Sequence, residues 1–248
     1  MSGHSRWATI RRKKGAVDAK RGQVFTKLVR EITTAVRLGG GDPNGNPRLR
    51  AAIMVAKSQS MTGDTIERGI KKGLGTLDGP APEEIMYEGY GPGGVAFLVE
   101  AQTDNRNRTS AEVRNTFSKS GGNLGASGSV AYMFEKRAQI VFDAGKVSED
   151  RVMEVALDAG ASDVTTEDDS ITVYGDWKSF ADLLECFERE KMTYASAEIA
   201  MIPENTVAVS GDDAERLMKL MEKLEELDDV QKVYANFDID EATLAKMA

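Results

Sequence analysis

The chain is short of the side chains on which most enzyme active sites depend. It has one histidine, His4, and one cysteine, Cys186. A zinc site built from His and Cys therefore cannot form within one copy, and a Ser-His-Asp triad would have to use His4. Cys186 stands among apolar neighbours, which favours a buried, unreactive thiol. Chemistry based on Asp, Glu or Lys alone is not excluded, but the sequence predicts a protein that is not an enzyme and uses no cofactor or metal.

Long apolar runs are also missing. No stretch of 18 apolar residues occurs, and the apolar runs are short, for example residues 51–56 and 95–99. We therefore predict no transmembrane helix and no membrane partner. The charged N-terminus is not followed by the apolar segment of a secretory signal. Residues 1–17 superficially resemble an organellar presequence but lack its recurring leucines. A single cysteine fits a reducing compartment, and we expect a cytoplasmic protein.

Acidic residues are scarce in the first third of the chain. Residues 1–80 hold 16 Lys or Arg against 6 Asp or Glu, whereas residues 81–248 hold 16 against 34. Such asymmetry indicates a basic element that meets polyanions. A solvated helix face explains balanced charges well but explains a one-signed excess of ten poorly. The composition therefore favours nucleic acid as the partner.

The basic third divides into an arm and a small helical domain. Residues 1–17 show no period and are predicted to form a flexible basic arm. From residue 18 an apolar stripe with helical spacing runs to a triple glycine at 39–41. Asn46 followed by Pro47 predicts the start of a second helix. A third is predicted from Thr62, with Ile66, Ile70 and Leu74 as its apolar stripe. We expect a helical domain over 18–79, followed by a Gly-Pro-Ala-Pro linker.

The remainder of the chain alternates strands and helices. Residues 136–203 follow the order β-α-β-β-α-β of a ferredoxin-like domain. Before it we predict strands at 84–90, 94–103 and 129–135 with a helix at 105–120. After it we predict strands at 206–209 and 230–237 around a helix at 212–227. We infer an α+β protein: a three-helix domain, then two ferredoxin-like α/β-sandwich domains, with residues 136–203 inserted into a discontinuous domain of 80–135 plus 204–240.

Three weak motifs have plainer interpretations beside their functional ones. The glycines at 89, 91 and 94 fit G-x-G-x-x-G, but a strand follows them, which favours a hairpin turn over a dinucleotide site. Gly122-Asn123-Leu124-Gly125 fits the G-x-x-G of KH domains, but a helix stop and loop is the better interpretation. The ferredoxin-like order is shared with RNA-binding domains, yet residues 138–202 hold 5 Lys or Arg against 15 Asp or Glu. This acidic domain more plausibly packs against protein, or keeps nucleic acid in one orientation by repulsion.

The arm supplies the largest group of candidate nucleic-acid contacts. Its cations can bind phosphates with release of counterions, and its tryptophan can stack on an exposed base. At residues 104–109, two arginines stand where a strand meets a helix N-terminus, which suits an anion as well as it suits a helix cap made by Asp104 or Asn105. The candidates are His4, Arg6, Trp7, Arg11, Arg12, Lys13, Lys14, Lys20, Arg21, Lys27, Arg30, Arg68, Lys71, Lys72, Arg106 and Arg108.

Several of these segments resemble the YebC/PmpR family. They are Gly3-His4-Ser5-Arg6-Trp7, Asp18-Ala19-Lys20-Arg21-Gly22, Phe25-Thr26-Lys27, Asn46-Pro47-Arg48-Leu49-Arg50, residues 87–94, residues 104–109 and residues 121–125. The resemblance runs over nearly the whole chain. It implies a cytoplasmic bacterial protein of three domains, with the third inserted into the second. It also implies a probable transcriptional regulator that binds DNA, while related proteins, among them a mitochondrial translational activator of cytochrome c oxidase subunit I, act on translation at the ribosome.

The sequence therefore predicts a nucleic-acid-binding regulator of gene expression. Duplex DNA and ribosomal RNA both remain open as partners, the second through binding to the ribosome. A flexible basic arm on an acidic body suits structured RNA slightly better, since such arms often order on binding. The alternative from another class is an acidic module that binds a protein partner.

Overall fold

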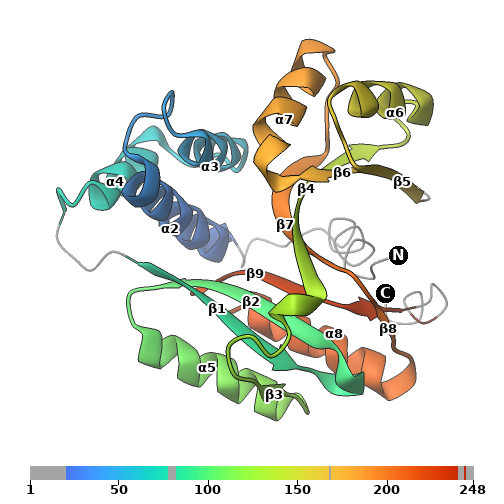
Figure 1. Cartoon of the computed structure of the whole chain (residues 1–248). Helices are drawn as coiled ribbons and strands as arrows, with labels where there is room; N and C mark the ends of the chain where they lie inside the picture. The colour runs from blue at the N-terminus through green and yellow to red at the C-terminus, as the bar shows by residue number, and fades with distance from the viewer. Residues whose placement is uncertain (1–20, 78–81, 168, 240–242, 244–248) are drawn as a thin grey trace. The chain divides into compact units, whose positions relative to one another are not determined.

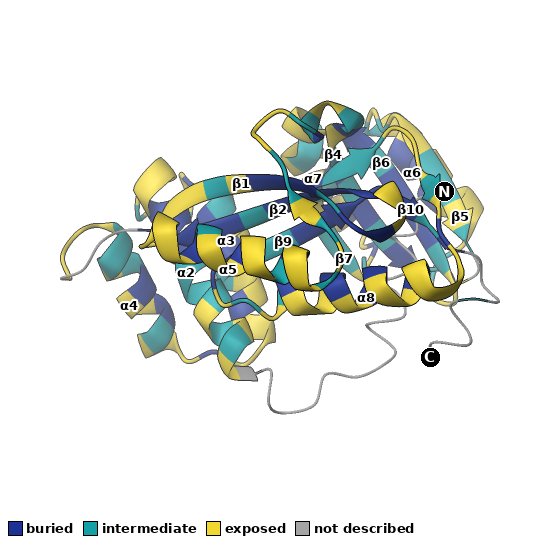
Figure 2. Cartoon of the chain, turned by 90° about the horizontal axis from the view of Figure 1, so that it is seen from below, coloured by how far each residue is buried: buried dark blue, intermediate teal, exposed yellow. Residues whose placement is uncertain are grey.

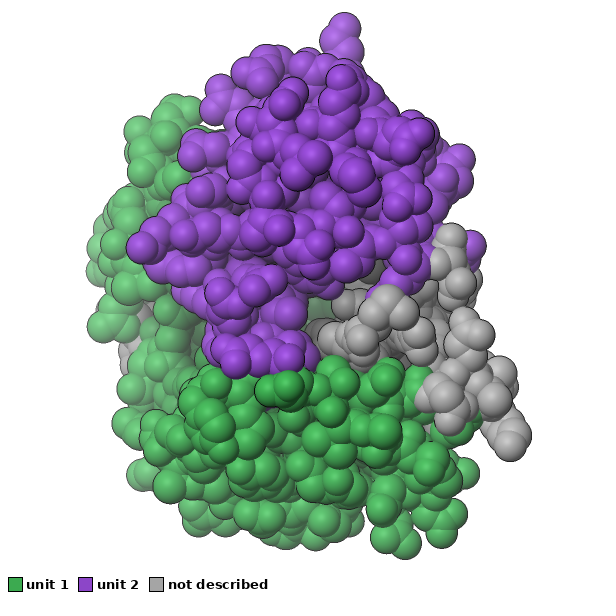
Figure 3. Space-filling view, turned by 45° about the vertical axis from the view of Figure 1, so that its right-hand side comes forward, with its two compact units in different colours: residues 1–133, 205–248 green, residues 134–204 purple. Residues whose placement is uncertain are grey.

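The computed structural model describes residues 21–77, 82–167, 169–239 and 243. The chain divides into two compact units, one made of residues 1–133 with 205–248 and the other of residues 134–204 (Figure 1, Figure 3). The predicted fold class is confirmed: helices come first, and two separate four-stranded sheets with their own helices follow. The second unit extends two residues before and one residue beyond the predicted insertion of 136–203.

Three helices form the first part of unit 1: α2 (Arg21–Gly39), α3 (Pro47–Ser58) and α4 (Gly63–Gly73). The predicted starts of α3 and α4 are confirmed. The Asn46 side chain accepts a hydrogen bond from the Leu49 N–H at 3.1 Å, and Thr62 caps α4 in the same way. These side chains satisfy N–H groups that have no partner inside the helix.

Close packing of α4 against α2 depends on two glycines. A Cβ at Gly69 would lie 3.1 Å from the Ile32 side chain, and a Cβ at Gly73 would lie 2.7 Å from the Thr33 carbonyl oxygen. Ile66 is buried on the same face, but Leu74, which the apolar spacing also placed inward, is 55% exposed. The prediction for Leu74 is wrong because the helix ends at Gly73, and the two glycines bring the backbones together instead.

The rest of unit 1 is an antiparallel sheet of order β3-β1-β2-β9, with α5 and α8 over one face (Figure 1, Figure 2). The buried side chains of both helices pack with those of the strands in one core. A short turn joins β1 to β2, so the hairpin interpretation of the glycine motif is confirmed. The elements are β1 (Glu83–Tyr90), η2 (Pro92–Gly94), β2 (Ala96–Thr103), α5 (Arg106–Lys119), β3 (Asn123–Leu124), η3 (Ala131–Met133), α8 (Gly211–Glu225) and β9 (Val230–Ala235).

Two predicted strands of this domain are placed differently in the structure. The strand expected at 129–135 is a turn and the short helix η3, and only its last two residues are extended, as the start of β4. The strand expected at 206–209 is β8 (Val207–Ala208), which pairs with β10 (Phe237–Asp238) in a sheet of two strands. The position beside β2 goes to β1, because a tight hairpin pairs strands that are adjacent in sequence.

Unit 2 is a ferredoxin-like domain with strand order β5-β6-β4-β7, all antiparallel. This is the order expected for a split β-α-β pair. Phe142 and Phe187 meet edge to face, 4.9 Å between ring centroids, at the centre of its core. Its elements are β4 (Phe134–Asp143), α6 (Glu149–Asp158), β5 (Asp163–Glu167), β6 (Ser170–Asp176), η4 (Trp177–Ser179), α7 (Phe180–Arg189) and β7 (Ser196–Pro203).

Candidate nucleic-acid interface

Half of the candidate contacts, those of the arm and Lys20, lie outside the described residues. This concerns His4, Arg6, Trp7, Arg11, Arg12, Lys13, Lys14 and Lys20. Arg21 opens α2, which fixes its backbone at the point where the arm joins the helical domain. The remaining seven candidates fall into three groups, one on α2, one on α4 and one at the start of α5.

The two candidates on α2 make contacts inside the protein. Lys27 Nζ donates to the Glu225 carbonyl oxygen at 2.6 Å, and the Arg30 guanidinium donates to the Asp228 carbonyl oxygen. One turn earlier on the same face, Gln23 Nε2 donates to the Glu226 carbonyl oxygen at 2.8 Å. Carbonyl groups at a helix C-terminus have no partner within the helix and carry partial negative charge. The cations of α2 therefore cap the end of α8.

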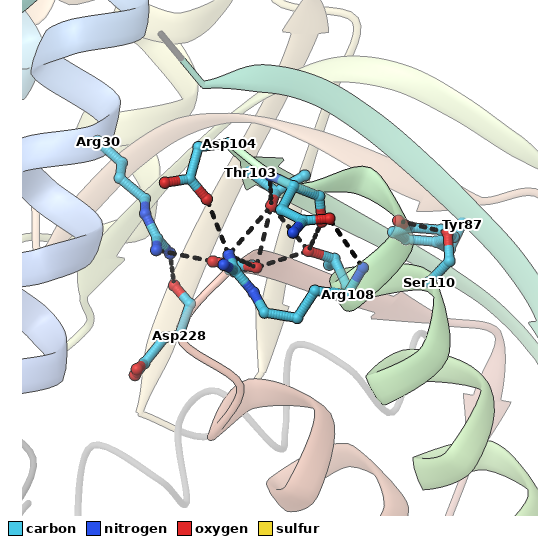
Figure 4. A network of polar contacts seen from close by, with 10 residues as sticks. Arg30, Tyr87, Thr103, Asp104, Arg108, Ser110 and Asp228 are labelled. Carbon is cyan, nitrogen blue, oxygen red and sulfur yellow. Dashed lines mark hydrogen bonds and ion pairs between the residues drawn. The ribbon is translucent and has the colours of Figure 1, made fainter. Parts of the chain in front are cut away.

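Arg30 and Arg108 both bind Asp229, which is 2% exposed (Figure 4). Arg30 Nη2 lies 2.7 Å from Oδ1, and Arg108 Nη2 lies 2.7 Å from Oδ2. Thr109 Oγ1 donates to Oδ2 at 2.5 Å, and Thr103 Oγ1 lies 3.0 Å from the same oxygen. One buried carboxylate thus joins α2 through an ion pair, and β2 and α5 through hydrogen bonds.

These contacts change the ionisation of the network. Burial alone would raise the pKa of Asp229, but the hydrogen bonds from Thr109 and Arg108, the charge of Arg30 and the hydrogen bond from Thr103 outweigh it and hold the pKa below its usual range. Hydrogen bonds to Asp229 and Asp104 raise the pKa of Arg108. Arg108 is therefore a permanently charged structural group whose guanidinium is already shared between two carboxylates.

At the start of α5, the structure supports the helix-cap interpretation, and it shows that Arg108 is engaged inside the protein. Asn105 Oδ1 accepts the Arg108 N–H at 3.1 Å, which is an N-cap bond. Arg108 also bonds Asp104 at 2.9 Å. Arg106 is exposed, and among the described residues it forms no ion pair. Of the two arginines, Arg106 alone keeps its charge available to an external anion.

The candidates on α4 differ in the same way. Lys71 Nζ lies 2.7 Å from Glu67 one turn earlier, whereas Arg68 and Lys72 form no ion pair with any described residue. Sequence reasoning missed two comparable cations on α3. Arg50 and Lys57 are exposed and face no described carboxylate within ion-pair distance. Their spacing of seven residues, which places both on one face of a helix, was the signal that could have found them.

Sequence reasoning also missed a polar network near the start of β1, formed by Arg48, Glu31, Glu84 and Gln102. Arg48 bonds both oxygens of Glu31, at 2.6 and 2.9 Å, and reaches Glu84 at 2.6 Å. Gln102 Nε2 donates to Glu31 at 2.7 Å. Hydrogen bonds to the two carboxylates raise the pKa of Arg48 above its already high value, against the effect of its partial burial. Arg48 therefore fastens α3 to α2 and to β1.

The glycine-rich segment after α5 is held by one buried carboxylate, Glu88 of β1. Its oxygens accept the N–H groups of Gly128, Val130 and Ala131 at 2.6 to 2.8 Å. Burial raises the pKa of Glu88, but these three bonds outweigh it, and the pKa lies below its usual value. Because these N–H groups are bound to a side chain, they cannot pair with a strand, which explains why the strand predicted at 129–135 does not form.

Unit 1 thus contains a helical domain with unpaired cations, which two charge networks, one buried and one partly exposed, join to a sheet covered by two helices. Family models match almost all of this chain: the TACO1/YebC protein N-terminal domain matches residues 5–76, and the TACO1/YebC second and third domain matches residues 82–237. The chain belongs to the TACO1/YebC family. The helical part is thus the N-terminal domain of the family, and the two sheets belong to its second and third domains.

Relatives match the chain over its full length. Proteins named "probable transcriptional regulatory protein" from Geobacter sulfurreducens and Syntrophobacter fumaroxidans are 56% and 54% identical to it, with 100% of each chain covered. The crystal structure of a conserved hypothetical protein from Aquifex aeolicus is 48% identical, with a TM-score of 0.85 over 91% of this chain and 93% of that one. The family relation therefore includes the fold as well as the sequence.

A membrane-spanning helix and a metal-binding cluster are both absent from the described residues. No described helix is long and apolar enough to cross a membrane. Within the same residues, no group of three or more His, Cys, Asp or Glu side chains is arranged to hold a metal ion. The printed names of the relatives point to regulation, and the cations on α3 and α4 are the surface features that need a function.

Proposed function

We propose that this chain is a nucleic-acid-binding regulator of gene expression that contacts phosphate groups through its basic arm and through unpaired cations of the helical domain. The observation that carries the proposal is the unbalanced charge on α3 and α4. Residues 21–77 contain ten Lys or Arg against four Asp or Glu. On α3 and α4, four cations form no ion pair with any described carboxylate: Arg50, Lys57, Arg68 and Lys72. Of these, Arg50 donates to the carbonyl oxygens of Pro43 and Asn44, which leaves its charge uncompensated.

Unpaired cations on a folded domain are a favourable way to bind a polyanion. They release counterions from the nucleic acid without first breaking an internal ion pair. The six Lys or Arg of residues 1–20 add to them and meet only one acid there. Lys27, Arg30 and Arg108 contribute less, because binding phosphate would cost each its present contact with the end of α8 or with Asp229.

The choice between duplex DNA and structured RNA depends on α4. The four residues between α3 and α4 give the spacing of a helix-turn-helix pair, in which the N-terminal residues of the second helix contact bases. Here the first two turns of α4 carry Asp64 and Glu67, both exposed, and they would meet the phosphates that line the groove. This arrangement favours structured RNA, although the printed names of the relatives favour transcription and hence DNA.

One pair of variants tests the binding surface. In the first, Arg50, Lys57, Arg68 and Lys72 are all replaced by Gln. In the matched control, four exposed cations on α5 and α8 are replaced in the same way: Lys119, Arg216, Lys219 and Lys223. Affinity for a labelled RNA hairpin and for a duplex DNA of equal length is measured by anisotropy from 50 to 200 mM salt. The salt slope of the first variant should fall by up to about 0.9 for each phosphate that it no longer binds, and that of the control should stay at the wild-type value.

A second experiment tests whether the arm contributes to binding and whether the bound polymer is RNA or DNA. Wild-type protein and a variant with Arg11, Arg12, Lys13 and Lys14 changed to Gln are sedimented with cell extract treated with RNase or DNase. Co-sedimentation with ribosomes that survives DNase, ends with RNase and weakens in the variant would support RNA. Binding that DNase alone abolishes would support the transcriptional alternative. Failure to bind either polymer at low salt would overturn the proposed function.

A further inference from the structure

Trp177 is an exposed large aromatic side chain of the inserted domain. It is 40% exposed, at the first position of η4, and it is not part of the apolar core of that domain. The Asp176 carboxylate accepts the Lys178 N–H at 2.9 Å and so fixes the turn that presents the ring. The ring is therefore held at the surface of the domain with part of it open to a partner.

Two ammonium groups lie at this ring. Lys136 Nζ is 4.6 Å and Lys178 Nζ is 5.8 Å from the ring centroid, and they come from different elements, β4 and η4. Neither lysine forms an ion pair with any described residue. The acids nearest in sequence are already engaged: Glu135 binds Arg137 at 2.5 Å, and Asp176 caps the turn. The two cations are therefore available to an external anion.

The position of these cations stands out against the charge of the domain. Residues 134–204 contain seven Lys or Arg against 17 Asp or Glu, so long-range attraction cannot bring an anion to this surface in general. Three of the seven cations, Lys136, Arg137 and Lys178, lie on the β4 and η4 segments that hold the ring. The surrounding acids would instead confine a polyanion to this one place.

We propose that Trp177, Lys136 and Lys178 form a second contact for single-stranded nucleic acid, in which one unpaired base replaces the ammonium groups over the indole ring and stacks on it, while these ammonium groups move to bind the flanking phosphates. Stacking platforms flanked by cations are the usual means of holding single strands without reading sequence. This proposal rests on the proposed function, because it assigns to the inserted domain a short stretch of the same nucleic acid. It also revises the expectation, drawn from net charge, that this domain packs against protein or only repels nucleic acid.

The test uses the full-length chain and a fluorescently labelled oligouridylate of about 12 nucleotides, with affinity read by anisotropy. Trp177→Ala should weaken binding about fivefold or more. Lys136→Gln and Lys178→Gln should each weaken it about fourfold at 0.15 M salt and lower the salt slope by about 0.7. Lys146→Gln is the matched control, since it removes one exposed lysine of the same domain that pairs with Asp143, and it should bind like the wild type. Trp177→Phe should retain most of the affinity if stacking is the interaction.

Fluorescence gives an independent readout, because the chain has only two tryptophans. In a Trp7→Phe variant all indole emission comes from Trp177, and oligouridylate should quench it. Wild-type affinity in the Trp177→Ala, Lys136→Gln and Lys178→Gln variants would overturn this inference and leave the proposed function standing. Quenching by oligoglutamate but not by oligouridylate would overturn it in favour of an acidic peptide. No binding of any nucleic acid by the wild type would overturn both proposals.

Discussion

Arg30 and Arg108 lie against a buried carboxylate, whereas Arg50 and Arg68 lie exposed with no described acid within ion-pair distance. All four count equally in the net charge of the chain. The first pair stabilises the joint between α2, α5 and the end of α8, and the second pair keeps its charge for a partner. The comparison shows that a charge count from sequence gives only an upper limit on the charge available for binding.

The same comparison separates two kinds of mutational effect. A charge inside a network affects the free energy of unfolding, since its removal leaves buried partners without compensation. A charge in solvent has little effect on folding and affects the partner instead. Stability and affinity should therefore respond to different arginines.

The largest effect on stability is expected from Asp229→Ala. This change removes the acceptor of Arg30, Arg108 and Thr109, so we expect the free energy of unfolding to fall by about 3 kcal/mol. Urea unfolding followed by circular dichroism measures it. Asp228→Ala is the control: its exposed carboxylate points away from the network in Figure 4, and only its carbonyl is used. A loss in the control as large as that in Asp229→Ala would contradict the assigned role.

The next largest effect is expected from lowering the pH, which should reduce the stability that the buried carboxylates provide. Asp229 and Glu88 have pKa values below their usual range in the folded protein. Their contribution is complete above the unfolded pKa values of about 4 and is lost as the pH falls through the lower folded values. The urea midpoint should therefore drop as the pH falls from about 5 to about 2.5, and it should drop less in Asp229→Asn. An equal drop in both proteins would show that Asp229 is not a source of the pH dependence.

Arg48→Lys should have a smaller effect, about 1 kcal/mol. Lysine keeps the charge but cannot bond Glu31 through two nitrogens while reaching Glu84. The expected loss is small because Arg48 and both acids are partly exposed and solvent screens the pair. Thermal unfolding measures it, with Arg50→Lys as the control two residues away. If Arg50→Lys lowers the stability as much, the contacts of Arg48 with Glu31 and Glu84 do not account for the loss.

The smallest effect on stability is expected from Arg68→Gln, within about 0.5 kcal/mol of the wild type. Its effect should appear in binding instead, as an affinity for nucleic acid lower by about fivefold at 0.15 M salt. Arg30→Gln should show the reverse pattern, with lower stability and a smaller direct loss of affinity. Anisotropy measures the affinity of both variants, and urea unfolding measures their stability on the same preparations. A large loss of stability in Arg68→Gln would contradict the distinction between paired and unpaired arginines.

Local signals in the sequence predicted much of the fold. Asn46 and Thr62 start helices because their side chains bond N–H groups three residues later, which depends on the neighbouring sequence alone. The insertion of one α+β domain into another could be inferred from the order of elements. The place of β1 beside β2 could not, because it depends on which strands pair, and that is decided by hairpin geometry and by Glu88 binding the segment expected to pair.

The site was harder to predict than the fold for a physical reason. Lys27 and Arg30 resemble the cations of the arm in sequence, and their partners are 198 residues away along the chain. Asp229 shows no pattern that marks it as buried. Arg50 and Lys57 could have been found, because helical spacing puts them on one exposed face. Distant pairing thus decides which charges are free.

The pairing of Phe134 with Pro203 at the base of unit 2 has a consequence for how this architecture can vary. The chain enters and leaves the inserted domain through adjacent antiparallel strands, so the two cut points lie about one strand spacing apart. The inserted domain could therefore be replaced by a turn of a few residues. It could also be replaced by another domain whose N- and C-termini lie close together. The host sheet would keep its own strands in either case, since none of them comes from residues 134–204.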